Sequence, residues 1–297
     1  MTDFVRIVEV APRDGLQNEA AMVATADKIA LVDRLSATGL RSIETTSFVS
    51  PRWVAQLADA AEVMAGIQRR PGVSYPVLVP NLQGYARARA AGADEVAVFT
   101  AASEAFNRRN INASIDESIE RFLPVLAQAR QDGVRVRGYV STVLGCPYQG
   151  EVPLADVIRV AARLHALGCY EISLGDTIGV GTPLKARAML LAVAGEVPMS
   201  ALAVHFHDTW GQALANVAAC VEAGVRVADA AVAGTGGCPY AKGASGNVAS
   251  EDLVYMLQGM GIETGIDLEA LADTGRWLAS RLGRDTGSKV GRALAAA

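Results

Sequence analysis

Short apolar runs rich in β-branched residues alternate with alanine-rich segments along most of this chain, and this alternation limits the folds open to it. The runs have the length and composition of strands, and the segments between them carry apolar residues at helical spacing. The predicted strands are Val5–Val10, Ser42–Ser47, Ser74–Val79, Glu95–Phe99, Val134–Tyr139, Tyr170–Leu174, Ala201–Phe206 and Val227–Val232. The clearest helical segments are Ala26–Leu35, Ala55–Ile67, Ile115–Ala129 and Leu154–Leu167. Strands that are mostly apolar indicate a parallel sheet covered by helices.

Glycines placed shortly before strands, such as Gly133 and Gly168, fit the left-handed end of a helix and support this alternation. Eight strands, each followed by a helix, predict an α/β fold of the (β/α)₈ TIM-barrel type. An open doubly wound sheet is the alternative, but the first strand is not followed by Gly-x-Gly-x-x-Gly, which argues against a dinucleotide-binding version. We expect one catalytic domain over residues 1–297, with the barrel over about 4–259 and added C-terminal helices over about 260–297.

The composition argues against several classes of partner. With 51% hydrophobic residues and a net charge of −4, the chain is typical of a globular protein and gives no reason to expect nucleic acid or an anionic membrane. No apolar stretch approaches the roughly 18 residues of a spanning helix, and we recognise no secretory signal. The four cysteines form no CxxC pair, so we expect a cytoplasmic protein in which Cys146, Cys169 and Cys220 are packing residues.

Two of the three histidines lie two positions apart, in the run Val204-His205-Phe206-His207-Asp208. Alternate residues of a strand share a face, so His205 and His207 are predicted to point into one volume while Phe206 packs the other way. Imidazole is a common ligand of divalent metals. Two hydrogen-bonded core histidines without a metal are the alternative, but an apolar strand lacks partners for two buried imidazoles. The pair therefore favours a metal site.

Other polar residues follow the ends of the predicted strands, where a barrel places its active site. They are Arg13 and Asp14 after the first strand, Glu44 on the second, Asp176 on the sixth, and Cys238 and Asn247 in the glycine-rich segment after the eighth. Each has a structural alternative: an ion pair at a turn for the first two, a partner of that arginine for Glu44, a helix cap for Asp176 and Asn247, and an incidental thiol for Cys238. Their convergence at one rim is the main argument for an active site.

The residue types suggest the chemistry. Two imidazoles with oxygen ligands from Asp14 and Asn247 would form a mixed site that suits Mg²⁺ or Mn²⁺ holding an oxygen-rich substrate, whereas structural zinc calls for more thiolates or a closed tetrahedron. Arg13 is always charged and can stabilise an oxyanion. Cys238 follows three glycines of a loop that can act as a lid. Together these groups suggest cleavage or formation of a carbon–carbon bond through an enolate.

At this point the motifs resemble those of the hydroxymethylglutaryl-CoA lyase family. The matching segments are Ala11–Glu19, Ile43–Pro51, Ser173–Gly179, His205–Gln212 and Gly236–Ala241 with its continuation to Asn247, within a resemblance that runs from Val5 to Lys289. The Arg-Asp-Gly and His-x-His elements are shared with isopropylmalate and homocitrate synthases, pyruvate carboxyltransferases and 4-hydroxy-2-oxoacid aldolases. The Gly-Gly-Cys-Pro-Tyr loop is much more specific to the lyase.

The resemblance implies a TIM barrel that binds a divalent cation and an acyl-CoA substrate. Carried over by position, the ligands are Asp14, His205, His207 and Asn247, the thioester and its enolate are stabilised by Arg13, the general acid/base is Cys238, and Glu44 and Asp176 are polar supports. Further substrate contacts are expected at Gln17 and, for the CoA phosphates, at Arg108, Arg109 and Asn110, although a solvated basic turn is an equal alternative for these last three. A homodimer is expected only through the family.

The implied reaction is the retro-Claisen cleavage of 3-hydroxy-3-methylglutaryl-CoA to acetoacetate and acetyl-CoA. Either Cys238 or Asp176 can remove the first proton. The alternatives are a Claisen-condensing synthase, a lyase for a longer-branched 3-hydroxyglutaryl-CoA, and a barrel without catalysis. The physiological metal and the pathway (leucine degradation, ketone-body formation or another branched acid) stay open.

Overall fold

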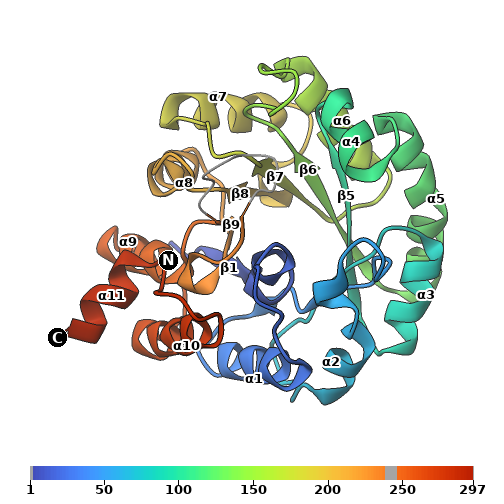
Figure 1. The fold of residues 1–297 in the computed structure, drawn as a ribbon. Coiled ribbons are helices and arrows are strands. Elements are labelled where there is room, and N and C mark those ends of the chain that lie inside the picture. The colour runs from blue at the N-terminus through green and yellow to red at the C-terminus, as the bar shows by residue number, and fades with distance from the viewer. Residues whose placement is uncertain (1–2, 238–245, 297) are drawn as a thin grey trace.

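The computed structural model describes residues 3–237 and 246–296, in which parallel strands form one sheet surrounded by helices (Figure 1). The strands are β1 (Arg6–Glu9), β2 (Ser42–Ile43), β3 (Thr46–Ser47), β4 (Val77–Leu78), β5 (Glu95–Ala101), β6 (Arg135–Ser141), β7 (Glu171–Asp176), β8 (Leu202–Phe206) and β9 (Val227–Ala230). The α-helices are α1 (Thr25–Ser36), α2 (Ala60–Gly66), α3 (Leu82–Ala90), α4 (Glu104–Ile111), α5 (Ile115–Asp132), α6 (Leu154–Ala166), α7 (Pro183–Val193), α8 (Ala213–Glu222), α9 (Ser250–Gly259), α10 (Leu268–Arg281) and α11 (Lys289–Ala296). Short turns of other helix types are η1 (Ala11–Gly15), η2 (Ala55–Leu57), η3 (Met199–Ala201) and η4 (Val232–Gly234).

The strand order closes the sheet into a barrel. It runs β2-β1-β9-β8-β7-β6-β5-β4-β3, and β2 and β3 are two pieces of the single predicted strand Ser42–Ser47. The first piece pairs with β1 and the second with β4, while the Ile43 N–H donates to the Ser74 carbonyl at the seam. Because the two ends of the order belong to one strand, the predicted (β/α)₈ fold is confirmed.

The local signals in the sequence locate the elements well. Every predicted strand coincides with a strand of the barrel, with bounds that differ by a few residues. Gly133, which ends α5, has a φ of 67°, and Gly168, which follows α6, has a φ of 109°. Both lie in the left-handed region where a side chain would be strained, so these glycines end helices as predicted.

The segment Ala55–Ile67, predicted as one helix, is instead split into η2 and α2, so that prediction was wrong. The break between η2 and α2 lies where Gln56 and Asp59 make polar contacts with residues outside this segment. The Lys28 ammonium donates to the Gln56 carbonyl and to both carboxylate oxygens of Asp59. The Gln56 side chain accepts the Val23 N–H at 3.1 Å. A continuous helix would use the Gln56 carbonyl for its own ladder, so the buried lysine outweighs helical periodicity here.

The C-terminal helices pack together against one side of the barrel. In Figure 1, α9, α10 and α11 lie together, with α10 next to α1, and α10 contacts α1, α9, α11 and η4. Asp252 in α9 fastens the start of α11, because its carboxylate accepts the Ser288 hydroxyl and the N–H groups of Lys289 and Val290. Of the helices in the described ranges, none combines the length and the apolar character needed to cross a membrane.

Candidate metal centre and its cavity

The carboxyl end of β1 leads directly into η1, the π-helical turn that carries Arg13 and Asp14. The N–H groups of Arg13 and Gly15 both donate to the Val10 carbonyl, which winds the turn. Gly15 is required there, because a Cβ would lie 2.3 Å from the Thr235 hydroxyl oxygen. The turn therefore packs against the chain that follows β9, and this contact sets where its side chains point.

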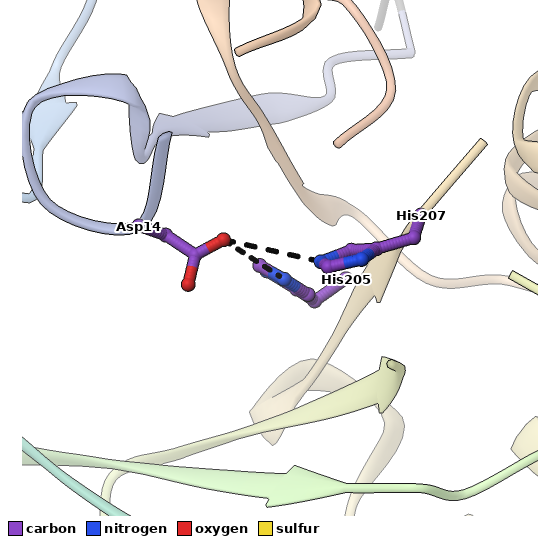
Figure 2. Close-up of side chains that lie close together, drawn as sticks. All are labelled: Asp14, His205 and His207. Carbon is purple, nitrogen blue, oxygen red and sulfur yellow. Dashed lines mark ion pairs between the residues drawn. The ribbon is translucent and has the colours of Figure 1, made fainter. Parts of the chain in front are cut away.

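His205 and His207 point into the mouth of the barrel from the end of β8, while Phe206 between them is buried in the core. Figure 2 shows the Asp14 carboxylate reaching the two imidazoles from η1. Its Oδ2 atom lies 3.9 Å from the Nε2 atom of each ring. The structure therefore places the two histidines on one face, as their spacing predicts, and adds Asp14. We call Asp14, His205 and His207 the Asp-His-His cluster.

The geometry of this cluster fits a divalent cation. A separation of 3.9 Å is too long for a hydrogen bond, but it suits ligand atoms that each lie about 2 Å from a shared ion. Burial, helped by the neighbouring His205, lowers the pKa of His207 to about 4, so this ring is neutral near pH 7 and can offer a lone pair. Burial alone would raise the pKa of Asp14, but Arg13 and the two imidazoles outweigh it and lower that pKa below its usual range. The possible donor set is thus two imidazole nitrogens and a carboxylate.

Asn247, the predicted fourth ligand, lies next to the cluster. Its Nδ2 donates to Oδ2 of Asp14 at 2.8 Å and to the Thr235 carbonyl at 3.2 Å. Its backbone forms a bridge with His207, and the side chain is buried. The chain after β9 therefore returns to the cluster at the predicted residue.

The two ends of the loop that contains Cys238 meet at this point. Gly246 lies so close to the carbonyl oxygens of Gly234, Thr235 and Gly236 that a Cβ would approach all three to within 2.6 Å. Cys238 itself, the predicted acid/base, lies outside the described residues. Of the described residues on either side of this segment, Gly236 and Gly246 lie against each other, and Asn247 follows beside the cluster.

Arg13 is held by two carboxylates. Its Nε donates to Oε2 of Glu44 and its Nη1 to Oδ1 of Asp14, both at 2.6 Å, and the guanidinium lies 5.3 Å from the centre of the Tyr139 ring. Burial alone would lower the pKa of Arg13, but the carboxylates of Glu44 and Asp14 outweigh burial and raise this pKa above its usual range. The side chain is therefore charged. Burial raises the pKa of Glu44, whose Oε1 has no partner among residues 3–237 and 246–296. Glu44 thus lies where it can orient Arg13.

Asp176 ends β7, and its carboxylate turns toward the backbone that follows this strand. Its carboxylate accepts the N–H groups of Val180 at 3.2 Å and Gly181 at 2.7 Å. Burial raises its pKa to about 6. Thr177 lines the cavity that opens onto the Asp-His-His cluster, whereas within the described chain Asp176 does not. This geometry favours Asp176 as a support of the β7–α7 loop over direct proton transfer.

A cavity of about 960 Å³ opens onto the Asp-His-His cluster and Arg13. Gln17, Arg109 and Asn110, which were predicted to contact substrate, all lie in its wall. Arg108 does not line it within the described chain, and its side chain is 66% exposed. Arg121 also lines the cavity and was missed by sequence reasoning, because it lies within the polar face of a helix.

Sequence reasoning also missed Asp229, which lies in β9 and is 1% exposed. Its carboxylate accepts from Arg137 Nη2 at 2.7 Å and lies 3.1 Å from Nδ1 of His205. A signal was present, since a single acidic residue in the apolar run Val227–Val232 must have a partner when buried. The partner, 92 residues away, could not be identified from spacing.

Fold and geometry together define a class of protein. The closed parallel barrel carries two imidazoles and a carboxylate around one centre at the carboxyl ends of its strands, beside a buried arginine and open to a large cavity. These features are those of a TIM-barrel enzyme with a divalent-metal site.

Comparison with known proteins narrows this class. The HMGL-like family model matches residues 4–278, and the chain belongs to this family. It is 62% identical over 97% of its length to the mitochondrial hydroxymethylglutaryl-CoA lyase of Gallus gallus, of which it covers 97%. It is 60% identical over 98% of its length to the 3-hydroxy-3-isohexenylglutaryl-CoA/hydroxymethylglutaryl-CoA lyase of Pseudomonas aeruginosa, of which it covers 97%. The crystal structure of a hydroxymethylglutaryl-CoA lyase from Pseudomonas aeruginosa superposes with a TM-score of 0.97 at 59% identity, over 100% of this chain and 99% of that one.

Proposed function

We propose that this protein is a carbon–carbon lyase that cleaves 3-hydroxy-3-methylglutaryl-CoA to acetoacetate and acetyl-CoA. The observation that carries the proposal is the Asp-His-His cluster beside Arg13, open to a cavity large enough for an acyl group and part of a CoA arm. The names of the relatives that match over nearly the whole chain support the substrate. We treat residues 1–297 as one catalytic unit, because the matching relatives are covered almost end to end.

The proposed cation site consists of the Asp-His-His cluster with the amide oxygen of Asn247 as a further ligand. The Asn247 amide nitrogen faces Asp14 in the structure, so a rotation of the amide would present its oxygen instead. A bound Mg²⁺ or Mn²⁺ would supply Lewis-acid chemistry that favours ionisation of the substrate's tertiary hydroxyl. The mixture of nitrogen and oxygen donors supports one of these ions over structural zinc.

Arg13 is proposed to stabilise the negative charge that develops on the thioester oxygen when the C2–C3 bond breaks. Once the hydroxyl proton is removed, C3 becomes the ketone carbon of acetoacetate and the electrons of the C2–C3 bond move into the thioester as an enolate. The guanidinium, held by Glu44 and Asp14, can donate to that developing oxyanion without further reorganisation. Glu44 is therefore proposed to orient Arg13 rather than to contact substrate.

Proton transfer is proposed to fall to Cys238. The thiolate form can take the hydroxyl proton, and the thiol that results can return this proton to C2 of the enolate, which yields acetyl-CoA. Gly237 lines the cavity and directly precedes Cys238 in the sequence, which supports delivery of the thiol by the loop. The amide hydrogen bonds of Asp176 support a positioning role for that carboxylate instead.

The CoA arm is proposed to follow the wall formed by Arg109, Asn110 and Arg121. Arginine suits phosphate because it offers several donors in one plane. Gln17 lies in the same cavity and is proposed to contact the acyl part of the substrate. The exposed Arg108 is the least supported of the predicted contacts.

Metal removal followed by reconstitution tests the proposal. The protein is stripped with a chelator, supplied with Mg²⁺ or Mn²⁺ and hydroxymethylglutaryl-CoA, and assayed for acetoacetate. We expect release of acetoacetate that depends on the added metal. Consumption of a 2-oxoacid with acetyl-CoA, in place of cleavage, would establish the synthase alternative and overturn the proposal.

A longer-branched 3-hydroxyglutaryl-CoA is a second candidate substrate. The relative from Pseudomonas aeruginosa carries both substrates in its name, and Leu78, Phe99 and Phe122 give this cavity an apolar wall. Comparing kcat/KM for substrates with methyl and longer branches decides between the two candidates.

A cytoplasmic location is supported by three buried free cysteines, Cys146, Cys169 and Cys220. The homodimer stays a prediction, which sedimentation analysis can check.

A further inference from the structure

The Asp229 carboxylate has three side-chain partners, Arg137, Ser173 and His205, where a simple ion pair would have one. Its Oδ1 accepts from Arg137 Nη2 at 2.7 Å, and its Oδ2 faces Arg137 Nη1 at 3.0 Å, the Ser173 hydroxyl at 2.9 Å and Nδ1 of His205 at 3.1 Å. These side chains come from β6, β7, β8 and β9, so the carboxylate joins four strands inside the barrel. Its two oxygens are fixed in direction by the bidentate arginine.

This arrangement determines which nitrogen of His205 carries a proton. A carboxylate paired with an arginine can only accept hydrogen bonds, so Nδ1 of His205 must be the donor. In the neutral form of the ring, the lone pair then lies on Nε2, on the side where Oδ2 of Asp14 lies 3.9 Å away. Asp229 therefore presents His205 to the cluster in the form that a cation requires.

His207 lacks such a support. Its Nδ1 is buried and has no hydrogen-bond partner in the described part of the chain, although its Nε2 is also 3.9 Å from Oδ2 of Asp14. The two imidazoles thus differ in how they are held: His205 has a hydrogen-bond partner at Nδ1, whereas His207 is held only by packing and by its backbone.

Arg137 explains why Asp229 keeps its direction. It is 1% exposed, and its Nε donates to Oε1 of Glu171 at 2.7 Å while Nη1 reaches the Tyr139 hydroxyl at 2.8 Å. The guanidinium is therefore anchored on two sides besides Asp229. Such a buried network holds its members in one arrangement when every donor has an acceptor.

We propose that Asp229, held by Arg137, is a positioning residue that sets the tautomer and orientation of His205 for the cation, and that the metal centre is asymmetric because His207 has no equivalent. This rests on the proposed function only in taking the Asp-His-His cluster as the metal site. Carboxylates in this position typically account for about 10- to 100-fold in metal affinity.

The first test compares Mn²⁺ affinity in Asp229→Asn and Ser173→Ala, measured by the electron-paramagnetic-resonance signal of free Mn²⁺. The first change replaces the carboxylate that faces Nδ1 of His205, whereas the second removes only the Ser173 hydroxyl that donates to the same carboxylate. We expect the Asp229→Asn affinity to fall about 10- to 100-fold, with turnover restored at saturating Mg²⁺, and the Ser173→Ala affinity to stay within about 3-fold. Equal affinity of Asp229→Asn and wild type would overturn the proposal.

The second test needs no metal and no variant of Asp229, so it holds even where Asp229→Asn fails to fold. Nitrogen-15 spectra of histidine-labelled, metal-free wild-type protein report the tautomer of each ring, and His165→Gln and His207→Gln assign the three signals. We expect His205 to carry its proton on Nδ1 at neutral pH. A proton on Nε2 would overturn the proposal. If the expected Mn²⁺ affinities and His205 tautomer are found but the protein does not cleave hydroxymethylglutaryl-CoA, the proposed reaction is wrong and the positioning role of Asp229 stands.

Discussion

Replacing Glu251 with glutamine tests the buried carboxylates that hold the turn after β9. Both oxygens of Glu251 accept the Ala233 N–H, at 3.0 and 3.1 Å, and Glu9 accepts the adjacent Val232 N–H at 2.9 Å. Both carboxylates are fully buried, and Ala233 has a φ of 60°. Glutamine keeps the shape of Glu251 and can still accept the Ala233 N–H, but it cannot ionise. The substitution therefore isolates the titration of one buried group.

Burial raises the pKa of Glu251 from 4.5 to about 8, with a smaller contribution from the charges of Glu9 and Asp252. Because the folded pKa lies above the unfolded one, the native protein keeps a proton that the unfolded chain releases between these values. The contribution to the free energy of unfolding is therefore fully present below the unfolded pKa and falls as pH rises, by about 1.4 kcal/mol per pH unit. Between about pH 5.5 and about pH 7.5 this amounts to about 2.5 kcal/mol.

Urea unfolding at these two pH values, followed by tryptophan fluorescence, measures the effect in wild type, E251Q and the control E269Q, whose carboxylate lies in an exposed residue of α10. We expect the free energy of unfolding of E251Q to gain about 2.5 kcal/mol on that of wild type from the lower to the higher pH. E269Q should follow wild type. Burial also raises the pKa of Glu9 to about 7, but the pH dependence of stability that Glu9 causes is common to all three proteins. A gap between E251Q and wild type that does not change with pH would refute the reasoning, because Glu251 would then be ionised in the native state.

Three further substitutions test the site. His207→Ala is expected to weaken Mn²⁺ binding and cleavage together by more than about 100-fold; metal-dependent cleavage that survives would reject His207 as a ligand. Cys238→Ser is expected to bind Mn²⁺ normally and lose about 10²- to 10⁴-fold in kcat, and a loss of only a few-fold would make the thiol a spectator. Gly246→Ala is expected to lower the free energy of unfolding by about 1–3 kcal/mol, because its Cβ would meet three carbonyl oxygens, whereas nothing lies within 4 Å of a Cβ at the control Gly237→Ala. Equal urea midpoints for the two glycine variants would contradict this packing argument.

The barrel was predictable because its signals are local. Apolar strands, helical spacing and glycines such as Gly133 each depend on a few neighbouring residues, and the i, i+2 spacing of His205 and His207 depends only on strand geometry. The seam in Ser42–Ser47 was not predictable, because it arises where one strand pairs with β1 at its start and with β4 at its end. The split of Ala55–Ile67 was equally hidden, since it depends on a lysine from α1.

The polar interior of the barrel illustrates the limit most clearly. Asp229 stands in the apolar strand β9 and Arg137 is buried in β6, so each of them needs a partner. Spacing cannot show that they pair with each other, because β9 and β6 are not neighbours in the sheet and meet only across the closed barrel. The same closure places a carboxylate at each nitrogen of His205, with Asp14 facing Nε2 and Asp229 at Nδ1. Local spacing thus predicts which residues bind a cation, but which imidazole is held in place follows only from the closed barrel, so the functional difference between His205 and His207 is a property of the fold rather than of the motif.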